Sequence, residues 1–380
     1  MRIVLLGASG NFGARILRDL RQDSRFETIP ATRNARANPM AQGLRTVELD
    51  FRSANFAAAL ARLRPQLVIH CAGPFQGQDY SVARAALAAG SHYLDLADGR
   101  RFVADFANAN HASALAADRL AVSGASTLPA LSGAVVERLR HGFDEIETVE
   151  IVIAPAQRAP RGAATIAAVF GYLGRPFPVL RNGALAYAWG WQDLRRVPLA
   201  IGARWAAACD VPDLELLPRT YPSLRTATFH AALEVGAQHF FLWTLAALLR
   251  GGIPVPLARW AARLDRIAGL FDVLGSETGA MWVRVDGKTK ESKKIQRIWH
   301  LVAPRNHGPE IPCMPATLLA QRLARGEIAA RGAHACIGFL TLDDFESEFR
   351  RWRIETYIEE GGRHSRRARL RGQPSAARRI

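Results

Sequence analysis

Short apolar runs and helical patterns alternate along about the first 125 residues. Apolar runs typical of strands cover residues 3–6, 27–32, 46–49, 66–71, 92–96 and 120–123. Between them, apolar residues recur at the three-to-four-residue spacing of one helix face, in residues 11–21, 53–63, 79–89 and 101–117. Strands that alternate with helices predict a parallel sheet with helices on both faces.

The pattern changes beyond about residue 140. Longer runs typical of strands occur at residues 147–153, 226–235, 281–286 and 294–302, with fewer helices between them. Such strands usually pair antiparallel, which predicts a second domain of the α+β class. Helices near residues 315–325 and 342–351 close the fold, and we expect the latter to pack back on the first domain. Residues 155–225 stay unassigned.

The first strand ends in a glycine-rich turn, Gly7-Ala-Ser-Gly-Asn-Phe-Gly13. Gly7 would form the tight turn, Gly10 would let the backbone approach a pyrophosphate, and Gly13 would let the helix pack closely on the strand. Free N–H groups at the helix start would face the phosphates. The turn therefore predicts a Rossmann dinucleotide-binding site; a glycine turn without a ligand is the alternative. Its predicted cofactor-binding residues are Gly7, Ser9, Gly10, Asn11, Phe12 and Gly13.

Together these patterns predict an α/β protein with two main domains. Residues 1–130 are expected to form a Rossmann domain with a doubly wound parallel sheet. Residues 131–340 are expected to form an α+β substrate and dimerisation domain with a mainly antiparallel sheet. Residues 341–360 would add a closing helix and strand. Residues 361–380 contain seven arginines and no acidic residue, which predicts a disordered basic tail.

The end of the second strand indicates which nicotinamide cofactor binds. A carboxylate there would bond the ribose 2′-hydroxyl of NAD, whereas an arginine would accommodate the 2′-phosphate of NADP. Here Arg33 and Asn34 follow the strand and no carboxylate is present. The planar guanidinium of Arg33 suits a phosphate, so we predict NADP, with NAD as the alternative. Arg33 or Arg36 could also be a solvated loop charge. Asp50, after the third strand, is expected to face the adenine.

The fourth strand ends in Cys71-Ala72-Gly73-Pro74-Phe75, at the edge that borders the nicotinamide ribose in a Rossmann sheet. Gly73 would let the cofactor approach, and Pro74 would stiffen the loop. Cys71 is interpreted as a small core residue because no histidine is positioned to activate it. His70, on the same buried strand, is expected to be structural. All five residues from Cys71 to Phe75 are predicted cofactor contacts.

Several motifs in residues 1–140 resemble the saccharopine dehydrogenase-like oxidoreductases. They are the glycine turn, the Arg-Asn pair, CAGPF, AALAAGSHYLDL and SGASTLPAL, with a weaker likeness in residues 326–349. The resemblance implies a nicotinamide-linked oxidoreductase with a small-molecule substrate and, commonly, a homodimer. It also implies pyrophosphate binding by the three glycines and 2′-phosphate binding by Arg33. The chain departs from the family at Ala97-Asp98-Gly99, where relatives commonly have a Gly-Glu turn, and residues 155–310 do not match a saccharopine-cleaving enzyme.

Hydride transfer needs a proton donor or acceptor beside the bound nicotinamide and substrate. Four residues at the end of the fifth strand are candidate catalytic residues, although alternation along the strand should turn two of them into the core. Histidines and arginines of the second domain are further candidates for the substrate site, each with a structural role as the alternative. The candidate catalytic residues are His92, Tyr93, Asp95 and Asp98. The further candidates for the substrate site are His230, His239, His300, Arg225 and Arg297.

Composition narrows the function classes further. The formal net charge is +16, and four widely spaced cysteines without a CxxC pair fit a reducing compartment, so we expect a cytoplasmic protein. No metal-ligand constellation can be placed, and no metal is predicted. The arginines of the tail are not interleaved with aromatic residues, which argues against specific nucleic-acid binding.

The apolar segment 240–249 is about half the length of a membrane span. We expect a buried or partner-facing helix there, with peripheral membrane contact as the minority alternative.

Three functions therefore remain open. The first is an NADP-preferring oxidoreductase acting on an unidentified small molecule. The second is a non-catalytic NADP-binding regulatory protein, because a fold alone cannot separate the two. The third is a membrane-surface protein held by segment 240–249 and the basic tail.

Overall fold

A computed structural model describes residues 1–34, 46–160, 162–253, 269–361 and 363–365. Seven parallel strands form the first sheet, in the spatial order β15-β6-β5-β4-β1-β2-β3. Their bounds are β1 (Arg2–Leu6), β2 (Glu27–Thr32), β3 (Val47–Glu48), β4 (Leu67–His70), β5 (His92–Asp95), β6 (Leu120–Ser123) and β15 (Gly332–Ala335). The predicted doubly wound parallel sheet is confirmed.

Helices cover both faces of this sheet because each presents an apolar stripe to it. On one face, Ile16 and Leu20 of α1 pack in one core with Ile3 and Leu5 of β1. The other face is covered by three helices that carry buried phenylalanine, leucine and valine side chains. The four helices are α1 (Asn11–Leu20), α2 (Phe56–Arg62), α3 (Ser81–Ala88) and α4 (Arg100–Ala116). Strands hidden on both faces read as continuous apolar runs, which explains the sequence pattern.

One edge of the first sheet comes from the C-terminal part of the chain. Strand β15 pairs in parallel with β6, in the register Gly332 to Leu120. Residues 332–335 fall in the range that the sequence assigned to the second domain, and the sequence pattern did not predict this strand. The first sheet therefore joins residues that are more than 200 positions apart in the chain.

The second sheet is mixed and mainly antiparallel, as predicted. Its order is β10-β11-β12-β7-β13-β14-β16-β17, with β8 pairing β12 and β9. Among the strands that the structure describes in this sheet, β7 and β12 are the one parallel pair, and the other pairs are antiparallel. The bounds are β7 (Glu145–Ala154), β8 (Pro176–Arg181), β9 (Ala184–Trp189), β10 (Arg195–Leu199), β11 (Gly202–Ala208), β12 (Thr226–Ala232), β13 (Gly279–Lys288), β14 (Lys294–Ala303), β16 (Glu355–Glu360) and β17 (Arg363–Ser365).

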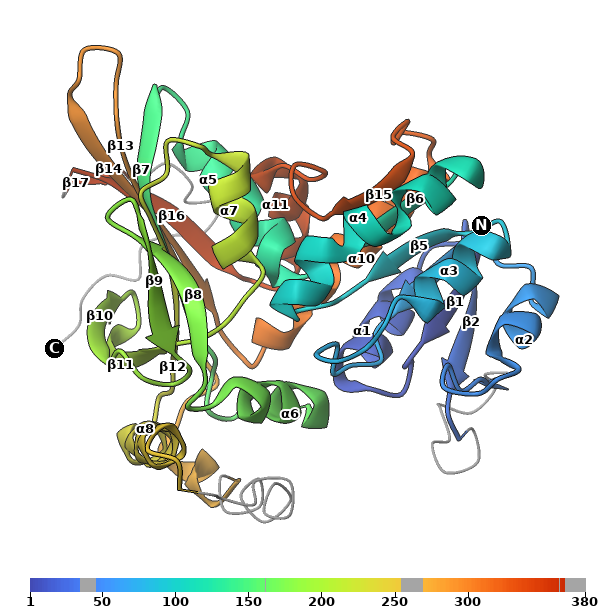
Figure 1. The fold of residues 1–380 in the computed structure, drawn as a ribbon, viewed down its shortest axis with the longest axis horizontal. Helices are drawn as coiled ribbons and strands as arrows, with labels where there is room; N and C mark the ends of the chain where they lie inside the picture. The colour runs from blue at the N-terminus through green and yellow to red at the C-terminus, as the bar shows by residue number, and fades with distance from the viewer. Residues whose placement is uncertain (35–45, 161, 254–268, 362, 366–380) are drawn as a thin grey trace, which may run out of the picture.

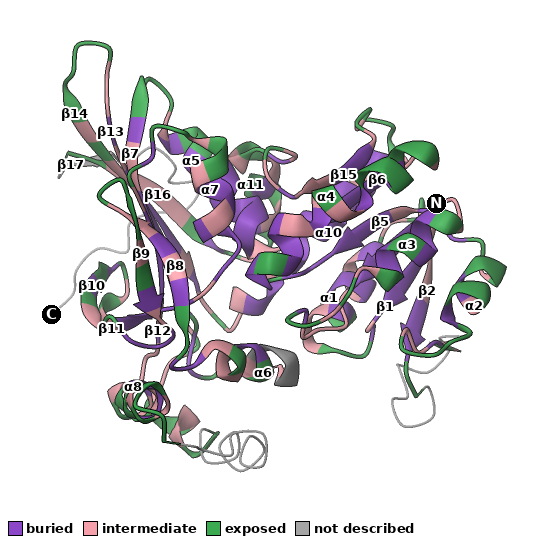
Figure 2. Ribbon diagram, in the orientation of Figure 1, coloured by how far each residue is buried: buried purple, intermediate pink, exposed green. Residues whose placement is uncertain are grey.

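The remaining helices lie between the sheets or beside the second sheet. They are η1 (Thr127–Leu131), α5 (Ser132–Leu139), α6 (Ala163–Tyr172), α7 (Asp213–Thr220), α8 (Gly236–Arg250), η2 (Phe271–Leu274), η3 (Gly308–Cys313), α10 (Met314–Ala324) and α11 (Leu342–Arg351). Figure 1 shows α5, α7 and α11 between the two sheets and α8 at the lower end of the molecule. Figure 2 shows that the central strands of the first sheet are buried along almost their whole length.

The closing helix α11 contacts the first domain, as expected. Its Arg351 guanidinium donates to the Asp19 carboxylate at 3.0 Å and to the Gln22 side chain at 2.8 Å, at the end of α1. A second link joins α1 to η3: Glu310, which is buried, pairs with Arg15 at 3.1 Å and Arg18 at 2.7 Å. These ion pairs fix the helix that follows the glycine turn against the C-terminal part of the chain.

Candidate nucleotide-binding site

The glycine turn has the geometry that dinucleotide binding requires. Gly7 has a positive φ of 79°, and a Cβ atom there would lie 2.9 Å from the backbone N of Ala72. A Cβ atom at Gly13 would lie 2.2 Å from the carbonyl O of Gly7, so only glycine lets α1 approach β1 this closely. Gly10 is exposed and its N–H donates to the Gly7 carbonyl at 2.9 Å. The turn thus leaves open backbone at the start of α1.

The predicted specificity residues follow β2 on the same edge of the sheet. Arg33 and Asn34 are exposed directly after the strand, while Arg36 lies outside the described residues. The N–H of Leu49 donates to the Thr32 carbonyl at 2.9 Å, which places the end of β3 beside the end of β2. Asp50 follows, half-buried, and its Oδ1 accepts the backbone N–H of Arg52 at 3.0 Å. The structure therefore gathers Arg33, Asn34 and Asp50 near one another.

The loop after β4 borders the glycine turn and is held in place by a residue that the sequence analysis missed. The Gln78 amide donates to the carbonyls of Ala72 and Pro74 at 2.9 and 2.7 Å. Phe75 is buried and makes an edge contact with the His70 ring at a centroid distance of 5.0 Å. Gly73 and Pro74 remain half-buried beside the turn. Burial raises the pKa of the Cys71 thiol, in agreement with its interpretation as a core residue.

A chain of buried polar groups runs beneath this edge. The Asp95 carboxylate is fully buried, and its Oδ1 accepts hydrogen bonds from the N–H groups of Ala97 and Gly124 at 3.0 and 2.8 Å and from the Ser123 hydroxyl at 2.9 Å. Burial raises the pKa of Asp95 to about 6, against the lowering effect of these donors. Asp95 therefore holds the loop after β6 against β5.

Tyr93 and His70 continue the same chain. The Tyr93 hydroxyl lies 3.1 Å from Nδ1 of His70, and both side chains are buried. Burial lowers the pKa of His70 to about 3, so its ring is neutral. The Tyr93 ring also stacks on Phe106, with centroids 5.8 Å apart. These two residues are packed into the core on the face covered by α3 and α4.

The other two candidate catalytic residues lie at opposite ends of β5. His92 is at the amino end, where its Nδ1 accepts the Leu120 N–H at 3.0 Å and burial lowers its pKa to about 4. Asp98 follows the carboxyl end, is exposed, and accepts a 3.3 Å hydrogen bond from the Gln76 amide. Although the residue reaches the surface, the protein packed around the Asp98 carboxyl desolvates it and so raises its pKa, against the lowering effect of the Gln76 hydrogen bond. Asp98 is therefore the candidate that combines exposure with a position at the nucleotide edge.

The second domain contributes residues near Asp98 that no sequence signal indicated. Burial, the neighbouring Cys209 thiol and the negative charge of Asp98 together raise the pKa of Tyr172, at the end of α6. Arg100, two residues after Asp98, is buried and pairs with Asp210 at 3.1 Å and Glu215 at 2.9 Å. These contacts join positions more than 70 residues apart in the chain, and for this reason spacing could not reveal them.

The second-domain histidines and Arg297 make their contacts in other parts of the fold, and Arg225 is exposed. His239 is buried against the Trp191 ring, His300 stacks on Tyr357 at 4.5 Å, and His230 lies 3.8 Å from the Asp193 carboxylate. The Arg297 guanidinium donates to the carbonyl of Leu139 at 2.8 Å. The Arg225 carbonyl accepts the Gly183 N–H at 2.7 Å. Among the described residues, no group of three potential metal ligands occurs.

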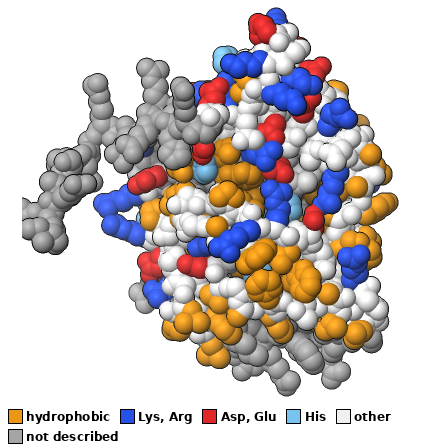
Figure 3. Space-filling model, turned by 90° about the vertical axis from the view of Figure 1, so that its left-hand side faces the viewer, with side chains coloured by type: hydrophobic (Ala, Val, Ile, Leu, Met, Phe, Trp, Pro, Cys, Tyr) orange, Lys and Arg blue, Asp and Glu red, His pale blue; other side chains and the backbone are white. Residues whose placement is uncertain are grey.

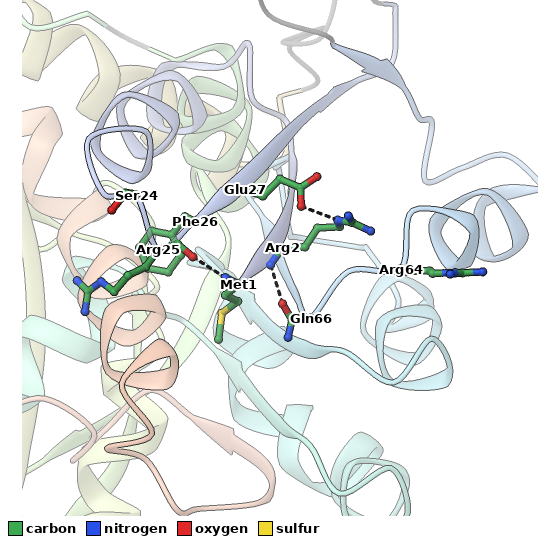
Figure 4. A pocket seen from close by; sticks show the side chains of 8 residues that line it. All are labelled: Met1, Arg2, Ser24, Arg25, Phe26, Glu27, Arg64 and Gln66. Carbon is green, nitrogen blue, oxygen red and sulfur yellow. Dashed lines mark hydrogen bonds and ion pairs between the residues drawn. The ribbon is translucent and has the colours of Figure 1, made fainter.

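Two hollows of the surface lie away from the nucleotide edge. One, of about 430 Å³, is lined by residues at the amino ends of β1 and β2, and the Arg2 N–H donates to the Gln66 side chain at 2.8 Å in its lining (Figure 4). The other, of about 260 Å³, lies on the second sheet between Glu150, Arg195 and His230. Ligands of doubly wound sheets bind at the carboxyl ends of the strands, so neither hollow is the predicted nucleotide site.

Comparison with known proteins agrees with this geometry. Residues 3–124 match the family described as the saccharopine dehydrogenase NADP binding domain. Two solved structures share the fold over most of the chain. Saccharopine dehydrogenase (L-Glu forming) from Saccharomyces cerevisiae is 12% identical, with a TM-score of 0.65, covering 94% of this chain and 99% of that one. Homospermidine synthase from Legionella pneumophila, solved in complex with NAD, is 9% identical, with a TM-score of 0.56, covering 99% and 94%.

None of the curated proteins matches the sequence. At these identities the structural likeness establishes the fold, whereas the family match assigns residues 3–124 to an NADP-binding domain. The resemblance to the saccharopine dehydrogenase-like oxidoreductases is confirmed.

Proposed function

We propose that this protein is an NADP-dependent oxidoreductase that transfers hydride to or from a small molecule. One observation carries the proposal: the glycine turn, with Gly7 at positive φ and Gly13 against the Gly7 carbonyl, lies in a segment that matches an NADP-binding domain. A bound nicotinamide would supply or accept the hydride, and the protein would supply orientation and electrostatics. Gly7, Gly10 and Gly13 would cradle the pyrophosphate at the start of α1.

The preference for NADP over NAD rests on the exposed Arg33. It follows β2 at the position where a 2′-phosphate would lie, and the described residues around it, Thr32, Asn34 and Asp50, leave its guanidinium at the surface. A guanidinium can form two parallel hydrogen bonds to a phosphate. In this proposal Asn34 supports the ribose, Asp50 faces the adenine, and residues 71–75 border the nicotinamide.

Asp98 is our proposed proton donor or acceptor. It is the exposed member of the four candidates. Its pKa is raised toward neutral pH, which favours a group that donates or accepts a proton. Tyr172 of α6 is a second polar group within electrostatic reach of Asp98. Tyr93 and Asp95 would act indirectly, by fixing the loops after β4 and β6. A homodimer is expected from the resemblance alone.

A non-catalytic NADP-binding protein is the second candidate. It is favoured by one observation: His92, Tyr93 and Asp95 are all bonded within the fold, so few groups are left for proton transfer. The two candidates share the nucleotide site and differ in whether Asp98 acts on a substrate.

Fluorescence titration with NADPH and NADH tests the nucleotide site. Replacing Arg33 by alanine should weaken NADPH binding about 10- to 100-fold, because one charge-assisted contact to phosphate is lost, and should leave NADH binding unchanged. Arg21→Ala is the matched control, since Arg21 is an exposed arginine at the far end of α1. Equal weakening for both nucleotides would contradict the assignment of Arg33, and failure of the wild-type protein to bind either nucleotide would contradict the proposed function.

A further inference from the structure

Exposed large hydrophobic side chains are concentrated at one end of the second domain. Ten such side chains are exposed among the described residues, and seven of them lie in α8, just after it, or in and beside η2. Their exposed fractions run from 40% at Phe240 to 76% at Val273. We call this surface the apolar end; its residues are Phe240, Phe241, Leu248, Ile253, Leu270, Val273 and Leu274.

Helix α8 is only partly buried, so of the two alternatives expected for residues 240–249, a buried or a partner-facing helix, the structure leaves the partner-facing one. It packs through His239, Leu245 and Ala246, which are its buried residues. Phe240, Phe241 and Leu248 lie on the exposed face, with Phe241 and Leu248 seven residues apart and so on the same side of the helix. Among the described residues, no helix is both long and apolar enough to span a bilayer. Over 15 residues α8 is about 22 Å long, which suits a position in the plane of a membrane surface.

The η2 segment is held beside the start of α8. The Glu234 carboxylate, two residues before α8, accepts the backbone N–H groups of Gln157 at 3.2 Å and Ser276 at 3.0 Å. Leu270, Val273 and Leu274 therefore extend the surface formed by α8. Figure 1 shows α8 and the orange η2 segment together at the lower extremity of the molecule, and Figure 3 shows hydrophobic side chains gathered on the lower half of the adjoining face.

Exposed arginines surround the apolar end. Arg196 lies over the Trp205 ring at 5.9 Å, and that ring contacts Phe240 at 5.8 Å. Arg250 ends α8 and lies over Trp189 at 4.5 Å.

Two more exposed arginines complete this border. Arg175 follows Gly174, whose Cβ position lies 2.8 Å from Leu249 of α8. The Arg158 guanidinium donates to the Asp272 carbonyl of η2 at 3.0 Å. α8 itself has no acidic residue; among the described residues, the carboxylates nearby are Glu234 before α8, which pairs with Arg204, Asp272 within η2 and Glu277 after it.

We propose that the apolar end inserts into the surface of a bilayer that contains anionic phospholipids. Phenylalanine, leucine, isoleucine and valine side chains would enter the boundary between headgroups and acyl chains, while the four arginines would contact lipid phosphates. A projecting end with an arginine border fits a lipid surface better than a second copy of this chain, because the same positive border would meet itself across a symmetric interface. The proposal is independent of the nucleotide site.

Vesicle flotation of the full chain tests the proposal. The vesicles are phosphatidylcholine alone, or phosphatidylcholine with about 30% phosphatidylglycerol. The wild-type protein should float with the anionic vesicles, and the double variant Phe241→Asp/Leu248→Asp should float about 10-fold less, because two carboxylates would have to enter the apolar layer. Leu115→Asp is the matched control: Leu115 is 51% exposed on α4, away from α8, and its variant should float like the wild type. Circular dichroism and urea unfolding of each variant confirm that it is folded.

Three results would overturn the proposal. The first is wild-type protein that floats with neither kind of vesicle. The second is unchanged flotation of the double variant together with lost flotation of a chain that stops at Ser365, which would assign binding to the arginine-rich residues 366–380. The third is a wild-type dimer in sedimentation that the double variant dissociates without any vesicle binding, which would make the apolar end an interface between copies. Flotation that falls for Arg158→Glu/Arg175→Glu on anionic vesicles would support the role of the arginine border.

Discussion

The two sheets accommodate their polar side chains differently, the first in buried hydrogen bonds and the second in ion pairs that are partly open to solvent. In the first sheet, which helices cover on both faces, Asp95 is buried and surrounded by three hydrogen-bond donors, and His70 is neutral. On the second sheet, Glu150 of β7 pairs with Arg195 and Arg284 at 3.0 and 3.1 Å, with both arginines partly open to solvent. A doubly covered sheet must satisfy its polar groups by hydrogen bonds inside the fold, whereas a sheet with an open face can leave paired charges in water.

Arg100 is the strongest test of this difference, because it is a buried charge at the junction of the two regions. Its guanidinium pairs with Asp210 and Glu215 and donates to the Pro178 carbonyl at 2.6 Å. Arg100→Ala would leave Asp210 without its partner and Glu215 paired with Arg219 alone, and should lower the free energy of unfolding by about 3–5 kcal/mol. Urea denaturation of the wild type and the variant measures this loss in the free energy of unfolding. Arg101→Ala is the control, since Arg101 is exposed and pairs with Asp105 on the helix surface; it should cost less than about 0.5 kcal/mol. Equal effects of the two variants would show that burial of Arg100 has no energetic weight.

Asp213 tests whether the covered side of the second sheet behaves like the first sheet. The side chain is buried and accepts a hydrogen bond from the Ser132 hydroxyl, and burial raises its pKa to about 7. Because the folded protein holds the proton more tightly than the unfolded chain, ionisation of Asp213 lowers the free energy of unfolding as pH rises from about 4 to about 7. Asp213→Asn should remove this loss and raise the free energy of unfolding at pH 8 by about 2–4 kcal/mol, with little change at pH 4.

Thermal or urea unfolding at several pH values measures the Asp213 effect. Asp144→Asn, at an exposed position, is the matched control and should show the wild-type pH dependence. An Asp213→Asn variant that is less stable than the wild type at pH 8 would mean that the fold prefers the ionised carboxylate. The covered side of the second sheet would then not behave like the first sheet.

Alanine substitutions at Gly13 and Gly10 test the packing of α1 on the first sheet and the proposed nucleotide site separately. Gly13→Ala would place a Cβ atom 2.2 Å from the Gly7 carbonyl, so it should cost about 1–3 kcal/mol of stability and also weaken NADPH binding. A Cβ atom at Gly10 would lie 3.2 Å from the same carbonyl, and Gly10→Ala should keep most of the stability while weakening NADPH binding. Paired urea and NADPH titrations separate the two effects. Undiminished NADPH binding by both variants would contradict the proposed pyrophosphate site.

The sequence by itself determined six of the seven strands of the first sheet and the glycine turn at which we propose the nucleotide binds. Apolar runs, helical spacing and the glycines at positions 7, 10 and 13 are local signals, because each strand of a doubly covered sheet must be apolar throughout and the turn needs residues without a Cβ atom. The long strands of the second sheet were also readable from their pattern.

Only the tertiary structure decided how the site is completed. Strand β15 joins β6, Gln78 holds the loop after β4, and Arg100 meets Asp210 and Glu215. These contacts connect positions brought together by packing, and periodicity carries no information about such partners. The fold likewise separated the four candidates on β5 and in the loop after it: it buried Tyr93 and Asp95, placed His92 at the amino end of the strand, and left Asp98 exposed. Alternation alone could not separate them, because β5 is covered on both faces.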